Sequence, residues 1–484
     1  MKTSTLLSIV SILALSAGTS IAADNYLVGT GWGGGGMAGN WSTGASPTIS
    51  EDIFIDYKYY FEAKAPEDTG NWGVSVYVYE GFANSKVNSM TIQNLYNPDT
   101  LTSETLRMQV SSTATACFDI KNDLTAVGDT YNSKAYLMIG KADVDSKILV
   151  GKDFNVGVST FQKGEGIHVY IGGTGSEKTS GTGGPSLVTV GGNLNIYGAS
   201  KLMSNIGTST QSGSTANLQV AGVVNMVGAG GTDNPTWYLN SRNSGSDVLN
   251  TVLQIGGLNG TGLIRNATST LGGSSTVIFK NAAGTTSKYI GIFKDDVTIG
   301  SISTVAVSMD GEGTQILTNV NISGPSEVKN GTLLAAGNFQ FLNVSANGKF
   351  GAEIETSAIG SVNVAYLNFD SGATLLFDID GANCDIVKAT EFILGAASDI
   401  MNIDVNAENI ISGNAYKIFE CGTLSGGFTE NNFKVNDIDG YDSQISIVGN
   451  DVYLTLNAVV PEPATYAAIF GALALAAAIR RGRK

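Results

Sequence analysis

Apolar and polar residues alternate along several short segments of the chain. In residues 72–79 (WGVSVYVY), Val74, Val76 and Val78 alternate with serine and tyrosine. A period of two places successive side chains on opposite faces of a β-strand. A shorter apolar run at residues 53–55 (IFI) predicts another strand. The hydrophobic pattern therefore predicts strands rather than amphipathic helices.

A degenerate unit occurs three times between positions 150 and 228. Its copies are irregularly spaced, at positions 150–156 (VGKDFNV), 190–196 (VGGNLNI) and 220–226 (VAGVVNM), and positions 255–257 (IGG) repeat its opening. Each copy consists of a small-residue turn followed by an apolar–Asn–apolar strand. Because one copy cannot bury its own apolar face, we expect successive copies to stack around a shared core.

The sixth position of each copy is an asparagine: Asn155, Asn195 and Asn225. An amide side chain can both donate and accept hydrogen bonds. Stacked copies would therefore place these side chains in a hydrogen-bonded ladder. We expect replacement of Asn195 by Ala to lower stability more than a surface substitution does.

Further apolar segments continue the pattern towards the C-terminus. They are residues 331–334 (GTLL), 372–381 (GATLLFDIDG), 416–419 (YKIF), 426–428 (GGF) and 451–456 (DVYLTL). These segments are similar to the closing rungs of autotransporter-type passenger domains. The glycine-rich residues 25–40, followed by residues 40–44 (NWSTG), resemble the start of such domains. This resemblance implies a β-solenoid.

We expect an all-β fold with a parallel β-solenoid or β-helix-like body, an N-terminal signal helix and a single C-terminal transmembrane helix. The alternative architecture is a set of β-sandwich domains with Greek-key connections. The expected organisation is a signal peptide at residues 1–22, an N-terminal β region or cap at 23–115, irregular solenoid repeats at 116–395, C-terminal β rungs at 396–458 and a sorting tail at 459–484.

Residues 1–22 have the three regions of a secretory signal peptide. Lys2 supplies a positive charge, residues 6–17 are almost entirely apolar, and the small-x-small site at residues 20–22 precedes Ala23. The apolar stretch is too short to span a bilayer stably. We therefore expect signal peptidase to cleave between Ala22 and Ala23 and the mature chain to be exported.

The C-terminal tail contains a Pro-Glu-Pro tripeptide, an apolar segment and a basic end. The charge-free residues 464–479 separate the tripeptide from the terminal sequence RRGRK, which holds half of the arginines in the chain. About 16 helical residues rise about 24 Å, less than a hydrocarbon core of about 30 Å. We expect a marginal membrane anchor whose basic end is cytoplasmic and whose preceding body is outside. The residues of the tripeptide and the basic end are Pro461, Glu462, Pro463, Arg480, Arg481, Arg483 and Lys484.

This tail, residues 459–484, resembles the PEP-CTERM family of sorting signals. The resemblance implies that exosortase, a membrane-embedded cysteine transpeptidase, cuts near the tripeptide and releases or re-attaches the protein at the cell surface. The alternative is a permanent single-span anchor. In both cases the body would lie at the cell surface, in the outer envelope or in the extracellular matrix, and only the C-terminal helix would contact the inner membrane before processing.

Composition supports a folded and strongly acidic body. The chain has 484 residues with 62 glycines, 8 prolines, 42% hydrophobic residues and a net charge of −15. Removing Lys2 and the four basic residues of the tail leaves 22 bases against 42 acids, a net charge of −20. A phosphate-binding surface needs clustered Lys and Arg, which the body lacks, so nucleic acid is not an expected partner.

Cysteine and histidine usage limits the chemistry that the chain can perform. The three cysteines, Cys117, Cys384 and Cys421, have no metal-binding spacing, and Cys384 could pair with Cys421 or all three could be buried as small apolar residues. The single histidine, His168, lies in a strand-like run, so we expect a position on a strand rather than in a catalytic triad. Histidine-rich zinc sites are excluded.

Two glycine-rich segments match nucleotide-binding motifs only in part. Residues 31–36 (GWGGGG) satisfy Gly-x-Gly-x-x-Gly, but no helix follows. Residues 172–179 (GGTGSEKT) approach a phosphate loop, but Glu177 stands where glycine is required. We interpret both segments as surface loops.

Closely spaced carboxylates are the remaining candidates for a ligand site. The pairs are Asp143 with Asp145, Asp295 with Asp296 and Asp378 with Asp380, and Asp437, Asp439 and Asp442 cluster around a glycine turn. The last group is a weak candidate for Ca²⁺, because this cation prefers several hard oxygen ligands. Solvated turns are the alternative interpretation, and no other metal or cofactor is expected.

These observations favour a non-catalytic surface or extracellular-matrix protein, an adhesin or a scaffold associated with exopolysaccharide in a biofilm. The PEP-CTERM resemblance implies the same setting, since such tails tend to occur in bacteria that build polysaccharide matrices. The alternative is a β-helix polysaccharide lyase or glycoside hydrolase, which needs a carboxylate pair, or Arg and Lys aimed at an acidic sugar, beside an aromatic platform. A third hypothesis is a surface layer that self-assembles through exposed strand edges.

Overall fold

The computed structural model describes most of the body and the C-terminal helix. The described residues are 23–26, 42, 48–56, 74–78, 86–94, 105–110, 117–128, 136–139, 147–161, 166–172, 187–207, 218–228, 230, 234–239, 241–242, 249–266, 273–298, 301–352, 359–459 and 463–481. The predicted signal peptide, with Ala22, lies outside these residues, and Ala23 is the first residue of β1.

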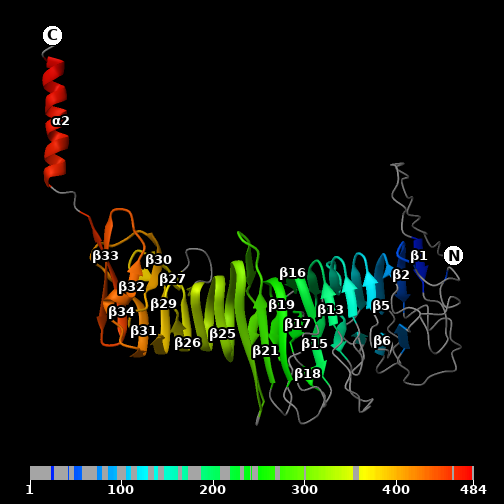
Figure 1. Cartoon of the computed structure of the whole chain (residues 1–484). Helices are drawn as coiled ribbons and strands as arrows, with labels where there is room; N and C mark the ends of the chain where they lie inside the picture. Colours follow the sequence, from blue (N-terminus) through cyan, green and yellow to red (C-terminus); the bar gives the residue numbers. More distant parts are fainter. Residues whose placement is uncertain are drawn as a thin grey trace, which may run out of the picture.

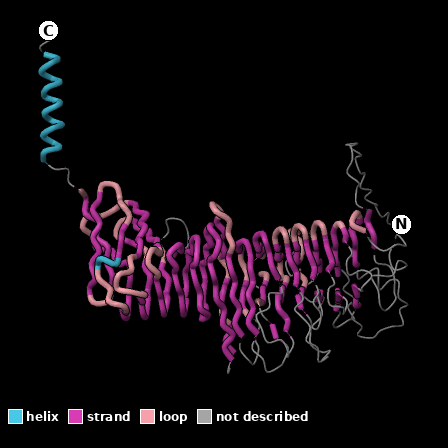
Figure 2. Tube along the Cα trace, in the orientation of Figure 1, coloured by secondary structure: helices cyan, strands magenta, loops and turns pink. Residues whose placement is uncertain are grey.

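The all-β prediction is confirmed over the described residues. They contain 34 strands joined in one hydrogen-bonded sheet, a short 3-10 helix and one α-helix. Figure 1 shows the strands stacked along one long axis, with the N-terminal strands at one end and the C-terminal strands at the other. Figure 2 shows that strands make up most of the body and that short loops connect them.

The N-terminal half contains three ladders, each a series of strands that pair in parallel with the next strand of the series. The first ladder contains β4 (Lys86–Val87), β7 (Cys117–Ile120), β10 (Lys147–Val150), β13 (Leu187–Val190), β16 (Leu218–Val227), β19 (Leu249–Gly260), β21 (Gly273–Phe279) and β25 (Ser301–Gly351). The second contains β1 (Ala23–Tyr26), β2 (Glu51–Asp56), β5 (Ser89–Asn94), β8 (Leu124–Gly128), β11 (Phe154–Val156), β14 (Leu194–Tyr197) and then β16, β19, β22 (Thr286–Tyr289) and β25. The third contains β3 (Val74–Val78), β6 (Thr105–Val110), β9 (Tyr136–Ile139), β12 (His168–Gly172), β15 (Lys201–Gly207), β17 (Thr236–Tyr238) with β18 (Ser241–Arg242), β20 (Leu263–Arg265), β23 (Ile292–Lys294) and β25.

Parallel pairing continues through the C-terminal half and ends at an antiparallel closure. One series is β25, β26 (Ser361–Phe369), β29 (Ile386–Leu394) and β31 (Ala415–Ser425), and another is β25, β27 (Thr374–Asp380), β30 (Met401–Glu408) and β32 (Phe433–Val435). The antiparallel pairs join β24 (Asp296–Thr298) to β25, β28 (Asn383–Cys384) to β27, and β34 (Asp451–Ala458) to β31 and to β33 (Tyr441–Val448). The short 3-10 helix η3 covers Glu430–Asn432.

The register confirms the alignment of the repeated unit. Val150 pairs with Val190, and Val190 pairs with Val220, so equivalent positions of irregularly spaced copies lie side by side. The structure adds an earlier copy at positions 120–126, because Ile120 pairs with Val150 and Leu124 pairs with Phe154. The sequence alignment missed this copy, since Lys121 and Asn122 stand where other copies have glycine and Thr125 replaces the asparagine.

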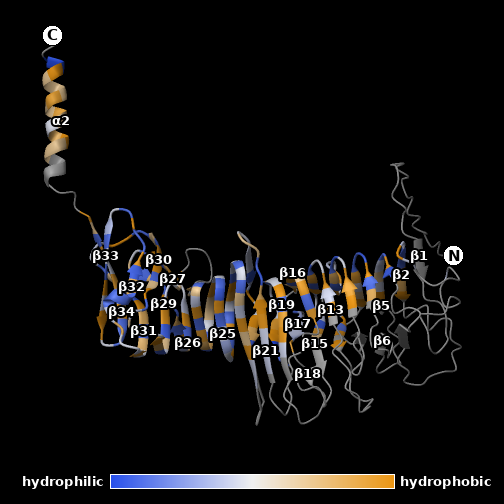
Figure 3. Ribbon diagram, viewed as in Figure 1, coloured by the Kyte–Doolittle hydropathy of each residue, from blue (hydrophilic) through white to orange (hydrophobic). Residues whose placement is uncertain are grey.

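Alternate residues of each strand form a continuous apolar core. Residues that pair in register across neighbouring strands are here called a row, and Figure 3 shows apolar and polar positions alternating along the strands. One fully buried row consists of Leu124, Phe154, Leu194, Val224 and Leu258. Burial of each such side chain contributes about 1.5–3 kcal/mol, so the core that a single copy lacks is supplied by its neighbours.

Glycines at the turns of the repeated unit allow neighbouring copies to approach closely. A Cβ atom added to Gly191 would lie 2.6 Å from the carbonyl oxygen of Gly151, and one added to Gly151 would lie 2.2 Å from that of Lys121. The amide of Gly191 donates to the Val150 carbonyl at 2.7 Å. The glycine position of the unit therefore follows from backbone contact across the stack.

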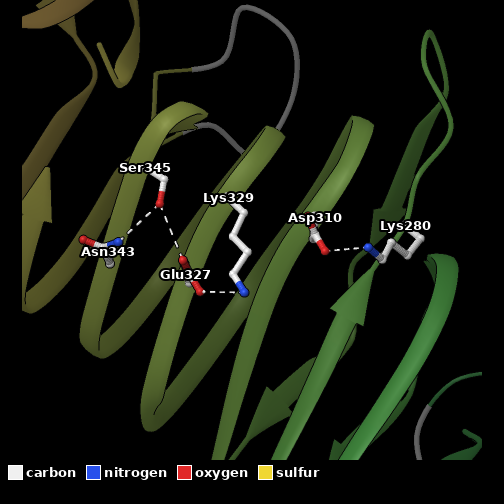
Figure 4. A network of polar contacts seen from close by, with 6 residues as sticks. All are labelled: Lys280, Asp310, Glu327, Lys329, Asn343 and Ser345. Atoms are coloured by element: carbon white, nitrogen blue, oxygen red, sulfur yellow. Dashed lines mark hydrogen bonds and ion pairs between the residues drawn. The ribbon is translucent and has the colours of Figure 1, made fainter. Parts of the chain in front are cut away.

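Polar contacts on the outer surface also connect neighbouring strands. Lys280 forms an ion pair with Asp310 of the next strand of the first ladder, and Glu327 contacts both Lys329 (3.3 Å) and Ser345 (3.5 Å; Figure 4). These groups are partly exposed, so each contact contributes at most about 1 kcal/mol. The apolar rows, rather than these pairs, dominate stability.

The predicted C-terminal helix forms, but its predicted role as a membrane span is not supported. Helix α2 covers Pro463–Arg481, and Figure 1 shows it set apart from the strands. Its described side chains, from position 467 onward, are exposed. Within the part of the chain that the structure describes, no helix has both the length and the apolarity needed to cross a membrane. Alanine and glycine supply much of the segment, and these small side chains add little hydrophobicity.

Candidate functional site

The predicted asparagine ladder is present in the structure. Asn195 Nδ2 donates to Asn155 Oδ1 at 2.9 Å, and Asn225 Nδ2 donates to Asn195 Oδ1 at 2.8 Å. The series extends at both ends, since Asn155 Nδ2 donates to Thr125 Oγ1 at 3.3 Å and Asn259 Nδ2 donates to Asn225 Oδ1 at 3.4 Å. Because these groups are satisfied by each other, the ladder is a structural feature rather than a ligand site.

A second and a third polar series were not predicted. Asn122 Nδ2 donates to Asn88 Oδ1, and Asn88 Nδ2 donates to Asp52 Oδ1, both at 2.8 Å. At the turn of the repeated unit, Asp153 Oδ1 accepts from the backbone N–H of Asn193 at 2.7 Å, and Asn193 Oδ1 accepts from the backbone N–H of Val223 at 2.9 Å. The second pair of bonds satisfies backbone N–H groups at the turn.

A groove of about 650 Å³ crosses strands β25, β26, β29 and β31 of the C-terminal half. Its lining residues are Asp295, Asn321, Ile322, Ser323, Asn338, Phe339, Gln340, Asn363, Val364, Ala365, Lys388, Ala389, Thr390, Glu420, Cys421 and Gly422. One row runs along its floor, since Asn338 pairs with Asn363, Asn363 with Lys388 and Lys388 with Glu420. The groove therefore runs across the strands, along the long axis of the body.

Amide side chains are the largest class of polar side chains in the groove. They are Asn321, Asn338, Gln340 and Asn363. Asn363 Nδ2 donates to Asn338 Oδ1 at 3.0 Å, and both side chains remain exposed. An amide has two donor hydrogens and two acceptor lone pairs, so each retains capacity for a further partner. The floor can therefore donate hydrogen bonds to a ligand and accept them from it.

The charged groups of the groove largely compensate each other. Lys388 Nζ lies 3.9 Å from Glu420 Oε2. Asp295 Oδ1 accepts from the Val305 amide at 2.6 Å. Burial raises the pKa of Asp295, and hydrogen bonds from Ser323 and from the backbone oppose the shift. The groove thus has one cation, which is paired, and no cluster of positive charge among its lining residues.

Two exposed aromatic side chains belong to residues one position beyond the lining of the groove. Phe341 and Tyr366 follow the groove residues Gln340 and Ala365 in the chain and pair with each other in register. Their ring centroids are 5.1 Å apart with an interplanar angle of 12°, so the rings are stacked. Phe341 is 43% exposed and Tyr366 is 39% exposed. Exposed stacked rings provide an apolar surface next to a polar floor.

A smaller groove of about 390 Å³ crosses other strands of the same half. Its floor includes the row Lys349, Thr374, Asn402 and Lys434, and Asp404 and Asp437 also line it. This groove contains both bases and acids, and no stacked aromatic pair borders it among the described residues. It is therefore the weaker candidate.

The predicted calcium residues do not form a metal site in the described structure. Asp437, Asp439 and Asp442 are all at least partly exposed. Across the residues that the structure places, no group of three or more His, Cys, Asp or Glu side chains could hold a metal ion. Asp378 and Asp380 of β27 accept hydrogen bonds from Asn406 (2.9 Å) of the neighbouring strand β30 and from Asn409 (2.7 Å), which directly follows β30.

His168 lies on strand β12, opposite Lys201 of β15. Burial, reinforced by the charge of Lys201, lowers the pKa of His168 to about 4. The imidazole is therefore neutral near pH 7. This position agrees with the predicted strand location.

Asp385 is a buried carboxyl that no sequence motif marks. It is 1% exposed and accepts from the amides of Gly360 (2.6 Å) and Asp378 (2.8 Å). Burial raises its pKa to about 6 despite these two bonds. Both of these donors are backbone groups, so Asp385 fixes the loop before β26 against β27.

The thiols of Cys384 and Cys421 are free, and both residues are partly buried. The suggested disulfide between them is thus absent. Burial raises the pKa of Cys384 to about 11 and that of Cys421 to about 12, so both thiols stay protonated. The side chain of Cys117 lies outside the described part of the structure.

The predicted sorting residues are only partly described. Pro463 begins helix α2, and Arg480 and Arg481 lie in its last turn, where positive charge interacts favourably with the helix dipole. Pro461, Glu462, Arg483 and Lys484 lie outside the described residues. No family model matches the chain, and no curated protein matches it in sequence.

Proposed function

We propose that the chain is an exported, non-catalytic protein of the cell surface or extracellular matrix whose β-solenoid body binds exopolysaccharide through the larger groove. The amide-lined groove beside the stacked Phe341–Tyr366 pair is the observation that carries the proposal. Glycan sites commonly combine hydrogen-bonding side chains with aromatic surfaces that cover the apolar face of a sugar ring.

The solenoid interpretation is supported by three parallel ladders that continue over many strands. β-Sandwich domains would instead pair their strands mainly in antiparallel fashion. In a solenoid each circuit of the chain contributes one strand to each ladder, so rows of side chains run along the axis. Such rows could bind an extended polymer.

The proposal of export and sorting is based on the sequences of the two termini. Residues 1–22 have the composition of a signal peptide, and residues 459–484 resemble PEP-CTERM sorting signals, which implies signal peptidase and exosortase as processing partners. Mass spectrometry of both termini of the native protein, in each cell fraction, tests this part. An intact chain from Met1 to Lys484 in the cytoplasmic fraction would contradict it.

The second candidate function is a lyase or hydrolase, because Asp295 and Glu420 both line the groove. Three strand spacings of about 4.8 Å separate Glu420 from Asn338, and Asp295 lies beyond Asn338. The two carboxyl groups are therefore more than about 14 Å apart, whereas catalytic pairs in glycosidases lie at most about 9.5 Å apart. This separation favours binding without turnover.

The proposal is tested by incubating the full chain with purified exopolysaccharide and with defined oligosaccharides. We expect co-sedimentation or a calorimetric binding signal without new reducing ends or unsaturated products. Release of such products in proportion to enzyme concentration would support the second candidate instead.

A further inference from the structure

We infer that the larger groove takes an uncharged glycan, with its chain along the long axis of the body and a sugar ring against Phe341 and Tyr366. This inference rests on the proposed glycan-binding function and specifies the ligand class. An uncharged glycan carries hydroxyl groups, which both donate and accept hydrogen bonds, or N-acetyl groups, whose amides can pair with the amide side chains of the groove. The amide-lined floor matches both kinds of group.

The charge of the groove disfavours an acidic glycan. Recognition of carboxylate or sulfate groups uses Arg or Lys in geometry that forms charge-assisted hydrogen bonds. The groove has one lysine, Lys388, and Glu420 already lies 3.9 Å from it. Asp295 adds an acidic group at the opposite end of the lining.

The field of the whole chain acts in the same direction. Its net charge is −15, with 42 acidic residues against 27 basic residues. A polyanion approaching such a body is repelled before it reaches the groove, and this repulsion is only partly screened at physiological ionic strength. An uncharged polymer experiences no such barrier.

The arrangement of the rows sets the direction and length of the ligand. Polar side chains on strands β25, β26, β29 and β31, at Asn338, Asn363, Lys388 and Glu420, line the floor. Three spacings of about 4.8 Å give a length of about 14 Å. A glycan lying along the axis would meet a polar group on each strand, so affinity should increase with chain length until the groove is filled.

Three hexasaccharides of equal length separate the possibilities, with the full chain titrated calorimetrically against each. The probes are a β-1,4-linked glucose hexamer, an N-acetylglucosamine hexamer and a galacturonate hexamer, each at low and at high salt. We expect binding to at least one of the two uncharged hexamers, with an affinity that changes less than twofold with salt and falls for the corresponding disaccharide. Preferential binding of the galacturonate hexamer would overturn the inference while leaving glycan binding intact. Failure of all three, together with failure of native exopolysaccharide, would overturn both.

Variants connect the binding to the groove. Replacing Phe341 and Tyr366 together by Ala should weaken binding at least tenfold, whereas Ile290→Ala, at a residue that is 56% exposed and is not part of the lining, should have no effect. Asn363→Lys should create measurable, salt-sensitive affinity for the galacturonate hexamer. Circular dichroism confirms that each variant is folded. Unchanged binding by the double variant, or no gain from Asn363→Lys, would contradict the inference.

Discussion

Replacement of Asn195 by Ala tests whether the asparagine ladder stabilises the stack. The Asn195 amide donates to Asn155 at 2.9 Å, accepts from Asn225 at 2.8 Å and is 7% exposed. Alanine removes two hydrogen bonds, each with a net contribution of about 1 kcal/mol, and leaves one acceptor and one donor without partners. Because Asn155 and Asn225 are only partly buried, water can satisfy them in part. We expect a loss of about 2–3 kcal/mol.

Asn195→Asp separates the donor role from the acceptor role. Aspartate can still accept a hydrogen bond from Asn225, but when ionised it cannot donate one to Asn155. A carboxylate oxygen at position 195 then faces Asn155 Oδ1, and the two oxygens repel each other. The variant should be at least as unstable as the alanine variant at pH 7. The folded state favours the protonated, donating form, which raises the folded pKa of the new carboxyl above its unfolded value. Stability relative to the parent should therefore recover as the pH falls through the folded pKa.

Urea denaturation gives the change in the free energy of unfolding, and hydrogen exchange locates it on the ladder strands. A loss of about 2–3 kcal/mol corresponds to on the order of 100-fold faster exchange through local unfolding of these strands. Asn431→Ala, at an exposed position, is the control. Equal small effects of Asn195→Ala and Asn431→Ala, or an aspartate variant whose relative stability does not depend on pH, would refute this reasoning.

Three further changes test other parts of the structure. The imidazole of His168, the single histidine of the chain, should titrate in ¹³C-histidine NMR with a pKa of about 4. The folded pKa of His168 lies below its unfolded value, so the free energy of unfolding should fall by up to about 3 kcal/mol as the pH drops from about 6.5 to about 4. His168→Gln should remove this part of the pH dependence. The raised pKa of Asp385 contributes with the opposite sign, and it does so equally in the parent and the variant. Gly191→Ala should cost about 1–3 kcal/mol in urea denaturation because its Cβ would lie 2.6 Å from a backbone oxygen, while Gly471→Ala in α2, with no atom within 4 Å, should leave the body unchanged. Phe392→Ala should cost about 3–5 kcal/mol because this fully buried ring packs against several other phenylalanine rings, and a cost below about 1 kcal/mol would argue against that packing.

The sequence was informative where neighbouring copies carry the same residue type. Asn155, Asn195 and Asn225 occupy one position of an alignable unit, and this repetition was sufficient to predict both the register and the ladder. The copy that ends at Ala126 was missed because Lys121 and Asn122 replace the glycines and Thr125 replaces the asparagine. A hydroxyl accepts the same hydrogen bond as an amide, so the contact persists after the recognisable pattern is lost.

The groove was not predictable in the same way. Asn338 and Asn363 share a residue type, but Lys388 and Glu420 continue the same row with opposite charges. Phe341 and Tyr366 lie on different strands, and neither stands in a recognisable motif. The site is produced by register between circuits of the chain, and register becomes visible only when the strands are paired.

The number of residues between paired positions differs between the two halves of the body. In the N-terminal half, residues that pair in the first ladder are 30, 40, 30 and 35 positions apart, from Ile120 through Val150, Val190 and Val220 to Ile255. A parallel ladder advances one strand spacing per circuit, so the additional residues of a long circuit must leave the ladder as a loop. From Asn338 to Asn363 and from Asn363 to Lys388 the interval is 25 each time, and from Lys388 to Glu420 it is 32. The residues added in the longer interval lie outside the row, because Glu420 still pairs with Lys388. The row of the groove therefore depends on strand pairing and not on a constant spacing of its residues along the sequence.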